Sequence, residues 1–275
     1  MMAQNILIIG LKNKNSGKTS LARAVISYLK EEEFNVSGFK PFSGNNIWYD
    51  FDMISEALKQ GRIYSKDVQF LKKESDINIG EESLNPIHRI WNEPSIIDPI
   101  THLPNFILDR INLQSGSHNE QLVVINQHNR QQLNKRYFKK IVEKSYITQP
   151  ISDIESLNKL TQKYYHKALV NTYQAIEKKF DFIVIESYAD QALLPWNGLH
   201  HFDVVLAIEP GHIMMYDPAQ YGKALQVSKQ VHSWEVSTQR IAELLKPMRR
   251  LSLTPKRSDE IISNLKNKVS VILDV

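Results

Sequence analysis

A short segment near the N-terminus constrains the fold of this chain more than any other. The apolar run Ile6–Ile9 indicates a buried strand, and the segment GLKNKNSGKTS, Gly10–Ser20, follows it directly. Residues 19–34 then carry apolar side chains at helical spacing. A strand, a glycine-bounded loop and a helix in direct succession predict a layered α/β structure in which the helix N-terminus points at the loop.

The loop ends in the Gly-Lys-Thr of phosphate-binding loops, although six residues separate its glycines where the usual pattern has four. In such a loop Gly17 lets the backbone approach phosphate, Lys18 neutralises phosphate oxygens and Thr19 ligates Mg²⁺. We therefore predict a nucleotide site, with a purely structural loop as the alternative. The residues expected to contact the nucleotide are Asn13, Lys14, Asn15, Ser16, Gly17, Lys18, Thr19 and Ser20.

Strand and helix patterns alternate along the rest of the chain. This alternation predicts an α/β fold with a doubly wound, mainly parallel sheet and helices on both faces. We expect one domain over residues 1–275 with an insertion around 110–170. The expected strands are 35–42, 120–127, 181–187, 202–211, 249–255 and 268–274, and the expected helices are 19–34, 49–61, 157–180 and 258–267.

Three regions lead to more specific expectations. Residues 78–116 are rich in Pro, Asn and Ser, which favours an ordered loop or short helical turns. The segment 209–217 follows a strand and favours a simple loop, with ligand contacts by Glu209, His212 or Asp217 as the alternative. The helical pattern near residue 170 predicts one buried stripe, made of Leu160, Tyr164, Ala168, Tyr173 and Ile176.

Composition excludes several classes of function. The chain has 34 Lys and Arg against 30 Asp and Glu, a mild excess that suits a phosphate-bearing ligand better than a nucleic acid. It has no cysteine, so disulfides and thiolate chemistry are excluded, and its nine histidines are scattered. No stretch reaches the roughly 18 apolar residues of a membrane span. We therefore expect a cytoplasmic protein with no nucleic-acid and no membrane partner.

Further segments, together with the extended loop, resemble the dethiobiotin synthetase family of P-loop ATPases. GFKPFSG, Gly38–Gly44, is similar to the family's Gly-aromatic-Lys-Pro-x-x-Ser-Gly, and NPIHRIWNEP, Asn85–Pro94, is similar to its Asn-Pro-aromatic loop. IVIESYAD, Ile183–Asp190, stands where the family has Val-Glu-Gly-Ala-Gly-Gly. The resemblance implies a P-loop NTPase fold and a homodimer with its sites near the interface.

The resemblance also implies roles for single residues. Lys40 would contact the substrate carbamate and the transferring phosphoryl group, and Glu186 would bind Mg²⁺, unless it is a surface acid at a strand end. Asp52 matches the family's aspartate at the start of the next helix, with Asp50 as the alternative, and either could merely cap that helix. The expected catalytic residues are thus Lys18 and Lys40, and the expected metal ligands are Thr19, Asp52 and Glu186.

These features predict a Mg²⁺- and ATP-dependent enzyme that activates a carboxylate or carbamate by γ-phosphoryl transfer. It would be a ligase or cyclo-ligase with a small-molecule acceptor; the alternative is a nucleotide-dependent switch or carrier ATPase that acts on a protein partner. ATP is expected over GTP because no Asn-Lys-x-Asp guanine motif occurs. On the substrate side the chain departs from the family, since Ser187–Asp190 replace its glycines and residues 95–102 replace its Ser-Pro-His. Lys12 or Lys14 could be an additional loop lysine, although surface charges are the favoured interpretation.

Overall fold

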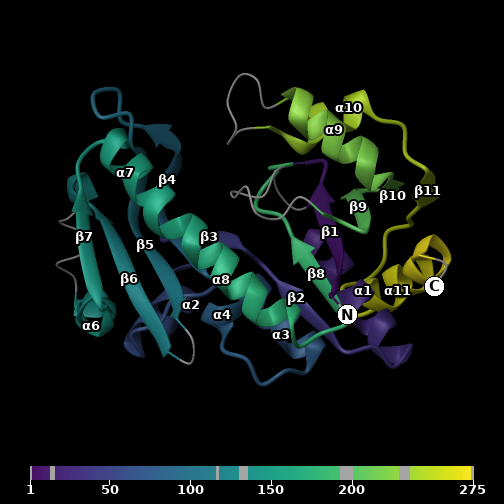
Figure 1. Ribbon diagram of the computed structural model, residues 1–275, viewed down its shortest axis with the longest axis horizontal. Coiled ribbons are helices and arrows are strands. Elements are labelled where there is room, and N and C mark those ends of the chain that lie inside the picture. Colours follow the sequence, from purple (N-terminus) through teal and green to yellow (C-terminus); the bar gives the residue numbers. More distant parts are fainter. Residues whose placement is uncertain are drawn as a thin grey trace. The chain divides into compact units, whose positions relative to one another are not determined.

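The computed structural model describes residues 2–12, 16–115, 118–129, 136–192, 201–228 and 236–273, which form two compact units (Figure 1). The first unit comprises Met1–Pro41, Phe70–Asn78 and Gln174–Val275, and the second comprises Phe42–Gln69 and Ile79–Tyr173. The single domain over 1–275 stays a prediction. The region expected as an insertion, around 110–170, belongs to the second unit, which begins much earlier in the chain.

The first unit is built on a six-stranded mixed sheet in the order β11-β10-β9-β1-β8-β2. Four neighbouring strands are parallel, namely β9 (Val204–Glu209), β1 (Gln4–Gly10), β8 (Phe182–Glu186) and β2 (Val36–Phe39). The remaining two, β10 (His212–Tyr216) and β11 (Arg249–Ser252), are antiparallel to their neighbours. The predicted α/β class is confirmed, and the strand before the glycine loop lies inside the sheet.

Helices α1 (Lys18–Glu31) and α11 (Ile261–Leu273) contact each other and share one hydrophobic core with the sheet. Leu265, Val269 and Ile272 of α11 are buried in that core. Their spacing of four and three residues is helical, so the strand predicted over 268–274 is wrong. The β-branched residues in this stretch suggested a strand, but packing against α1 outweighs their local preference.

The segment after β9 forms a hairpin with β10, which corrects the simple loop predicted there. His212 pairs with Glu209, so only Pro210 and Gly211 connect the two strands. Proline favours the first position of such a turn, and Gly211 has φ +95°, a value that glycine adopts without strain. Two helices follow this hairpin in the chain. Helix α9 (Pro218–Ser228) contacts β9, and α10 (Thr238–Leu244) contacts α9.

The second unit contains a five-stranded mixed sheet in the order β3-β4-β5-β6-β7. Its strands are β3 (Phe42–Asn46), β4 (Ile87–Ile97), β5 (Pro104–Ser115), β6 (His118–Asn126) and β7 (Ile147–Ile151). The prediction of a loop or short helical turns over 78–116 is correct for the short helix at Glu81–Leu84 but wrong for β4 and β5, which form a long antiparallel pair. Register shifts after Ile90 and on to Ile97 let β4 carry the Asn-Glu-Pro sequence that suggested a loop.

Helices α2 (Phe51–Lys59), α4 (Glu81–Leu84) and α6 (Arg136–Lys144) belong to the second unit, with a 3₁₀ turn at Gln127–Asn129. Gly61, the last residue of the helix expected over 49–61, stops α2, since its φ is +66° and its N–H donates to the Leu58 carbonyl. Helix α3 (Lys66–Ser75) contributes to both units. Within the described ranges no helix is long and apolar enough to cross a membrane.

A π-helical turn changes the face that the long helical region buries. Helix α7 (Ile154–Leu160) runs through a π turn (Thr161–Tyr165) into α8 (His166–Glu177). The predicted stripe is correct at Ala168, Tyr173 and Ile176, but Leu157 and Tyr165 are buried in place of Leu160 and Tyr164. One wider turn changes the helical phase, so regular 3.6-residue spacing fails on its N-terminal side.

Candidate functional site

Gly10 ends β1 where the chain turns back over it. A Cβ atom at this position would collide with the Ser16 side chain and lie 3.0 Å from Lys18 Nζ. A glycine is therefore required here by close packing, the condition under which a loop can wrap around an anion. Asn13, Lys14 and Asn15 lie outside the described residues, Lys12 is exposed, and Ser20 lies partly buried in the first turn of α1.

Gly17 forms the N-terminal cap of α1. Its φ is +97°, and its carbonyl accepts the first helical hydrogen bond, from the Leu21 N–H at 2.9 Å. No acidic side chain lies in the first turn, so the helix dipole and its N–H groups are not offset by a local negative charge. The predicted arrangement of a glycine, a lysine and a helix start is confirmed as local geometry.

Lys18 points toward the segment that follows β8. Its Nζ donates to the Ala189 carbonyl at 2.5 Å and approaches Ser16 Oγ at 3.5 Å. Ala189 has φ +45°, a left-handed conformation that a non-glycine residue rarely adopts. Ala189 stands where the resembling family has a glycine, the residue type that adopts this conformation without strain.

Thr19, Lys40 and Glu186 meet at the carboxyl ends of the parallel strands. The Glu186 Oε1 accepts from Thr19 Oγ1 at 3.0 Å and from Lys40 Nζ at 2.5 Å. Glu186 is 1% exposed and Lys40 is 4% exposed, so this ion pair is buried. The alternative of a surface acid is therefore wrong for Glu186, and the structure brings together three of the predicted residues.

A strap formed by residues 236–238 fixes the segment after Glu186 next to the loop. Thr238 Oγ1 donates to the Gly10 carbonyl, and its backbone N–H donates to the Asp190 carbonyl at 2.6 Å. The Ala192 N–H donates to the Val236 carbonyl at 2.8 Å. Thr238 is fully buried. Sequence reasoning missed it, since a Ser-Thr pair signals a helix start but not what the helix start contacts.

Asp50 and Asp52 lie in the second unit, at the start of α2. Asp50 Oδ2 accepts from the Asn46 N–H at 3.0 Å and from Asn45 Nδ2 at 2.9 Å, which closes the turn after β3. Asp52 is exposed in the first helical turn, where its carboxylate interacts favourably with the helix dipole. A metal-binding role for Asp52, or for Asp50, stays a prediction.

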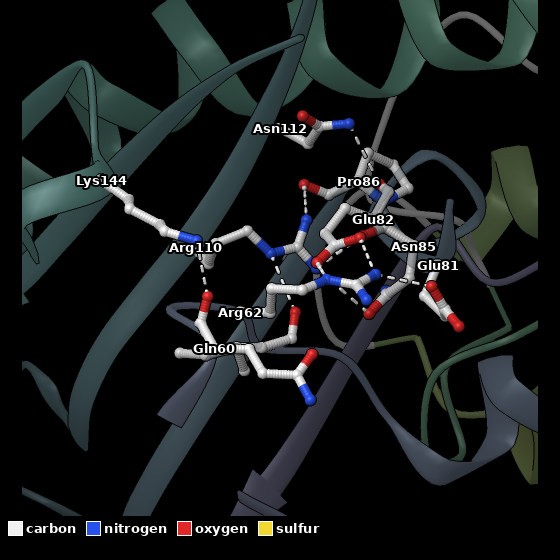
Figure 2. A network of polar contacts seen from close by, with 10 residues as sticks. Gln60, Arg62, Glu81, Glu82, Asn85, Pro86, Arg110, Asn112 and Lys144 are labelled. Carbon is white, nitrogen blue, oxygen red and sulfur yellow. Dashed lines mark hydrogen bonds and ion pairs between the residues drawn. The ribbon is translucent and has the colours of Figure 1, made fainter. Parts of the chain in front are cut away.

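The second unit holds a partly buried cluster of charged groups that sequence reasoning did not anticipate (Figure 2). Arg62 donates to Glu81 at 2.6 Å and to both carboxylate oxygens of Glu82 at 2.6 and 2.7 Å. Burial opposes the charged form of Glu82, but its hydrogen bonds with Arg62 and the positive charges of Arg110 and Arg62 together lower its pKa. The same contacts raise the pKa of Arg62.

Beside this cluster, Arg110 is fully buried with backbone carbonyls as its acceptors (Figure 2). It donates to the carbonyls of Ile63 at 3.2 Å, Pro86 at 3.1 Å and Asn85 at 2.7 Å. Burial lowers the pKa of Arg110 to about 10, so the guanidinium stays charged at neutral pH. The Arg110 side chain thus ties β5 to the segments at Ile63 and at Asn85–Pro86, and its role is structural.

A second buried ion pair spans β4 and β5. Arg89 donates to both oxygens of Asp109, at 2.7 and 2.6 Å, and the Tyr165 hydroxyl donates to the same carboxylate. The guanidinium lies over the Phe106 ring, 4.3 Å from its centroid. Burial, followed by the Asp109 charge, raises the pKa of Tyr165 well above its ordinary value. Tyr165 ends the π turn, so this contact accounts for the burial of Tyr165 in place of Tyr164.

A third polar cluster joins β3 to β4. Ser43 Oγ lies 2.7 Å from Asn85 Oδ1 and 2.6 Å from His88 Nδ1. All three residues are at most 1% exposed. A serine next to a histidine is the start of a nucleophilic dyad, but this hydroxyl lies in the protein core, so the cluster supports the strands.

The loop and the Glu186 region thus form the candidate site of the first unit. Among the described residues no three His, Asp or Glu side chains converge as a metal site would require. Glu209, His212 and Arg250 approach one another only loosely, with Glu209 Oε1 3.7 Å from His212 Nδ1 and 3.9 Å from Arg250 Nη2.

Compared with protein-family models and with curated proteins, the chain matches none of them.

Proposed function

We propose that the first unit is a P-loop NTPase fold and that the protein is a Mg²⁺- and ATP-dependent enzyme. The observation that carries this proposal is the meeting of Thr19, Lys40 and Glu186 beside a loop that requires glycine at Gly10. Lysines positioned around a phosphate, together with hard oxygen donors for a cation, are the groups that phosphoryl transfer needs.

The residues present fit a magnesium ion. Thr19 Oγ1 and Glu186 Oε1 are oxygen donors 3.0 Å apart, and oxygen is the ligand that Mg²⁺ prefers. Because no cluster of three acidic or histidine side chains is found in the described ranges, the remaining ligands would come from phosphate and water. When bound, the ion supplies neutralisation of phosphate charge.

The proposed reaction is activation of a carboxylate or carbamate by the γ-phosphoryl group of ATP, followed by attack of an amine on the activated carbon. Lys18 would hold the phosphates and Lys40 would stabilise the group in transfer. The test is product formation from Mg·ATP with and without 7,8-diaminononanoate and bicarbonate, which are the substrates of the resembling family, following ADP and the cyclic urea separately.

Three results would bear on the proposal in different ways. ADP and cyclic urea together, both lost in Lys40→Ala while ATP binding at saturating Mg²⁺ is nearly unchanged, would support the ligase. Equal loss of binding and turnover in Lys40→Ala would refute the assigned role of Lys40. Slow ADP release that is independent of the acceptor would support the nucleotide site but not the tested acceptor. The protein would then use another acceptor, or it would hydrolyse ATP without a chemical acceptor.

A second candidate is a nucleotide-dependent switch or carrier ATPase that acts on a protein partner. The observation in its favour is the second unit, which presents exposed aromatic side chains at Trp48, Tyr49 and Phe51. Exposed aromatic groups in one short segment are typical of protein contact surfaces. A nucleotide-dependent change in oligomeric state or partner binding, without any acceptor, would favour this candidate.

A further inference from the structure

One carboxylate oxygen at the candidate site makes two contacts that would have to change if a metal ion bound there. Glu186 Oε1 accepts from Thr19 Oγ1 at 3.0 Å and also pairs with Lys40 Nζ at 2.5 Å. Lys40 directly follows the last residue of β2, and Glu186 is the last residue of β8, the parallel neighbour of β2. The ammonium group therefore lies at the carboxylate proposed to bind a divalent cation.

Because both charged groups are buried, the loss of either partner would be energetically costly. The Lys40 side chain is 5% exposed and that of Glu186 is 1% exposed. Removing one partner of a buried pair leaves an uncompensated charge, which is far more costly than the pair itself. A cation is thus required beside Glu186 whether or not nucleotide is present.

We propose that Lys40 is the resident counter-ion of Glu186 and competes with a divalent cation for that carboxylate. This inference rests on the proposed function, because it supposes that Thr19 and Glu186 hold the metal of Mg·ATP. Like charges a few ångströms apart repel, so one carboxylate oxygen does not hold an ammonium and a divalent ion equally well. Lys40 accordingly leaves Glu186 when another cation takes its place, and the nucleotide phosphates are then its nearest source of negative charge.

The opposite arrangement would have an opposite signature. If Lys40 helped to assemble the metal site, its removal would weaken metal binding. If it competes, its removal strengthens metal binding although it abolishes turnover. The sign of the change in metal affinity therefore separates the two, independently of catalysis.

The experiment measures binding of a non-hydrolysable ATP analogue by calorimetry at increasing free Mg²⁺. For Lys40→Met we expect the Mg²⁺ concentration at half-saturation to fall by roughly ten- to a thousandfold, the range by which a neighbouring charge shifts an ionic equilibrium. Lys40→Arg keeps the charge and should stay near the wild type. Lys30→Met removes a positive charge from the exposed end of α1 and should leave the midpoint unchanged.

An unchanged or higher Mg²⁺ midpoint in Lys40→Met would overturn the competition. Should that variant not fold, Lys40→Gln keeps a polar side chain of similar length without the charge and is measured in the same way. Thermal unfolding without nucleotide gives a second readout, in which excess Mg²⁺ should stabilise the uncharged variants Lys40→Met and Lys40→Gln more than the wild type or Lys40→Arg. A wild type that binds the analogue at no Mg²⁺ concentration would refute the proposed function itself, whereas analogue binding with an unchanged midpoint would refute only the role of Lys40.

Discussion

The hydroxyl of Thr238 donates to the carbonyl of Gly10, which joins the start of α10 to the first glycine of the loop after β1. The same residue holds the segment after Glu186 through its backbone N–H, which donates to the Asp190 carbonyl. Two chain segments that carry the candidate site are thus fixed to one buried residue from a distant part of the sequence, one by its side chain and one by its backbone.

Thr238→Val should therefore weaken nucleotide binding. The substitution keeps the shape of the side chain but leaves the buried Gly10 carbonyl without this donor, which costs about 1–3 kcal/mol. Expressed wholly in affinity, this is roughly a 5- to 150-fold increase in the dissociation constant for Mg·ATP. The matched control is Ser237→Ala, which removes the side-chain cap of α10 and should cost about 1 kcal/mol of stability without changing that affinity. Equal effects of both variants on affinity would reduce Thr238 to a general structural role.

Gly10→Ala should abolish nucleotide binding while the fold is retained. The added Cβ would collide with Ser16 and lie 3.0 Å from Lys18 Nζ, so the loop must change its conformation. Gly222→Ala is the control, because nothing lies within 4 Å of a Cβ there and α9 should gain about 0.5–1 kcal/mol. Circular dichroism and nucleotide titration of both variants check the prediction, and normal binding by Gly10→Ala would contradict it.

The Arg62–Glu82 contact should make stability depend on pH in the acid range. The folded state lowers the pKa of Glu82, so the unfolded chain binds more protons. The stabilisation is therefore present above the unfolded pKa and is lost as the pH falls through the folded one. When the pH is lowered from about 6 to about 3, the free energy of unfolding of Glu82→Gln should therefore fall less than that of the wild type.

The control for this effect is Glu155→Gln, in the exposed pair with Lys159. Exposed pairs of this kind contribute little, so the pH dependence of this variant should match the wild type. Urea unfolding at each pH measures both variants. A Glu82→Gln variant with the full acid sensitivity of the wild type would show that other groups carry the dependence.

How far the sequence predicts this structure depends on how local each signal is. Gly10, Lys18 and Thr19 lie in one short motif whose spacing already specifies a loop and a helix start, and Glu186 ends an unmistakably apolar strand. Thr238 could not be found in this way, because its role comes from a contact across more than two hundred positions.

The second unit shows the same limit for the fold. Pro94 and its polar neighbours suggested a loop, yet tertiary pairing with β5 makes this stretch a bulged strand. The strand expected over 35–42 ends at Phe39, two residues before Pro41, which cannot donate to a sheet, and the chain then enters β3 in another sheet. Local preferences were informative where a segment packs on its sequence neighbours, and they failed where distant strands decided its conformation.

The Arg89–Asp109 pair should be among the most sensitive positions of the second unit. Asp109 is fully buried and accepts both hydrogen bonds of the guanidinium, so Asp109→Asn leaves a buried positive charge and should cost about 3–5 kcal/mol. Tyr165→Phe removes only one donor to the same carboxylate and should cost about 1–2 kcal/mol. Replacing both charges, in Arg89→Met with Asp109→Leu, should cost less than the sum of the two single changes, because neither charge is then left alone. Urea unfolding of these proteins measures the coupling, and additive losses would mean that the aromatic contacts of Arg89, and not its charge, hold β4 against β5.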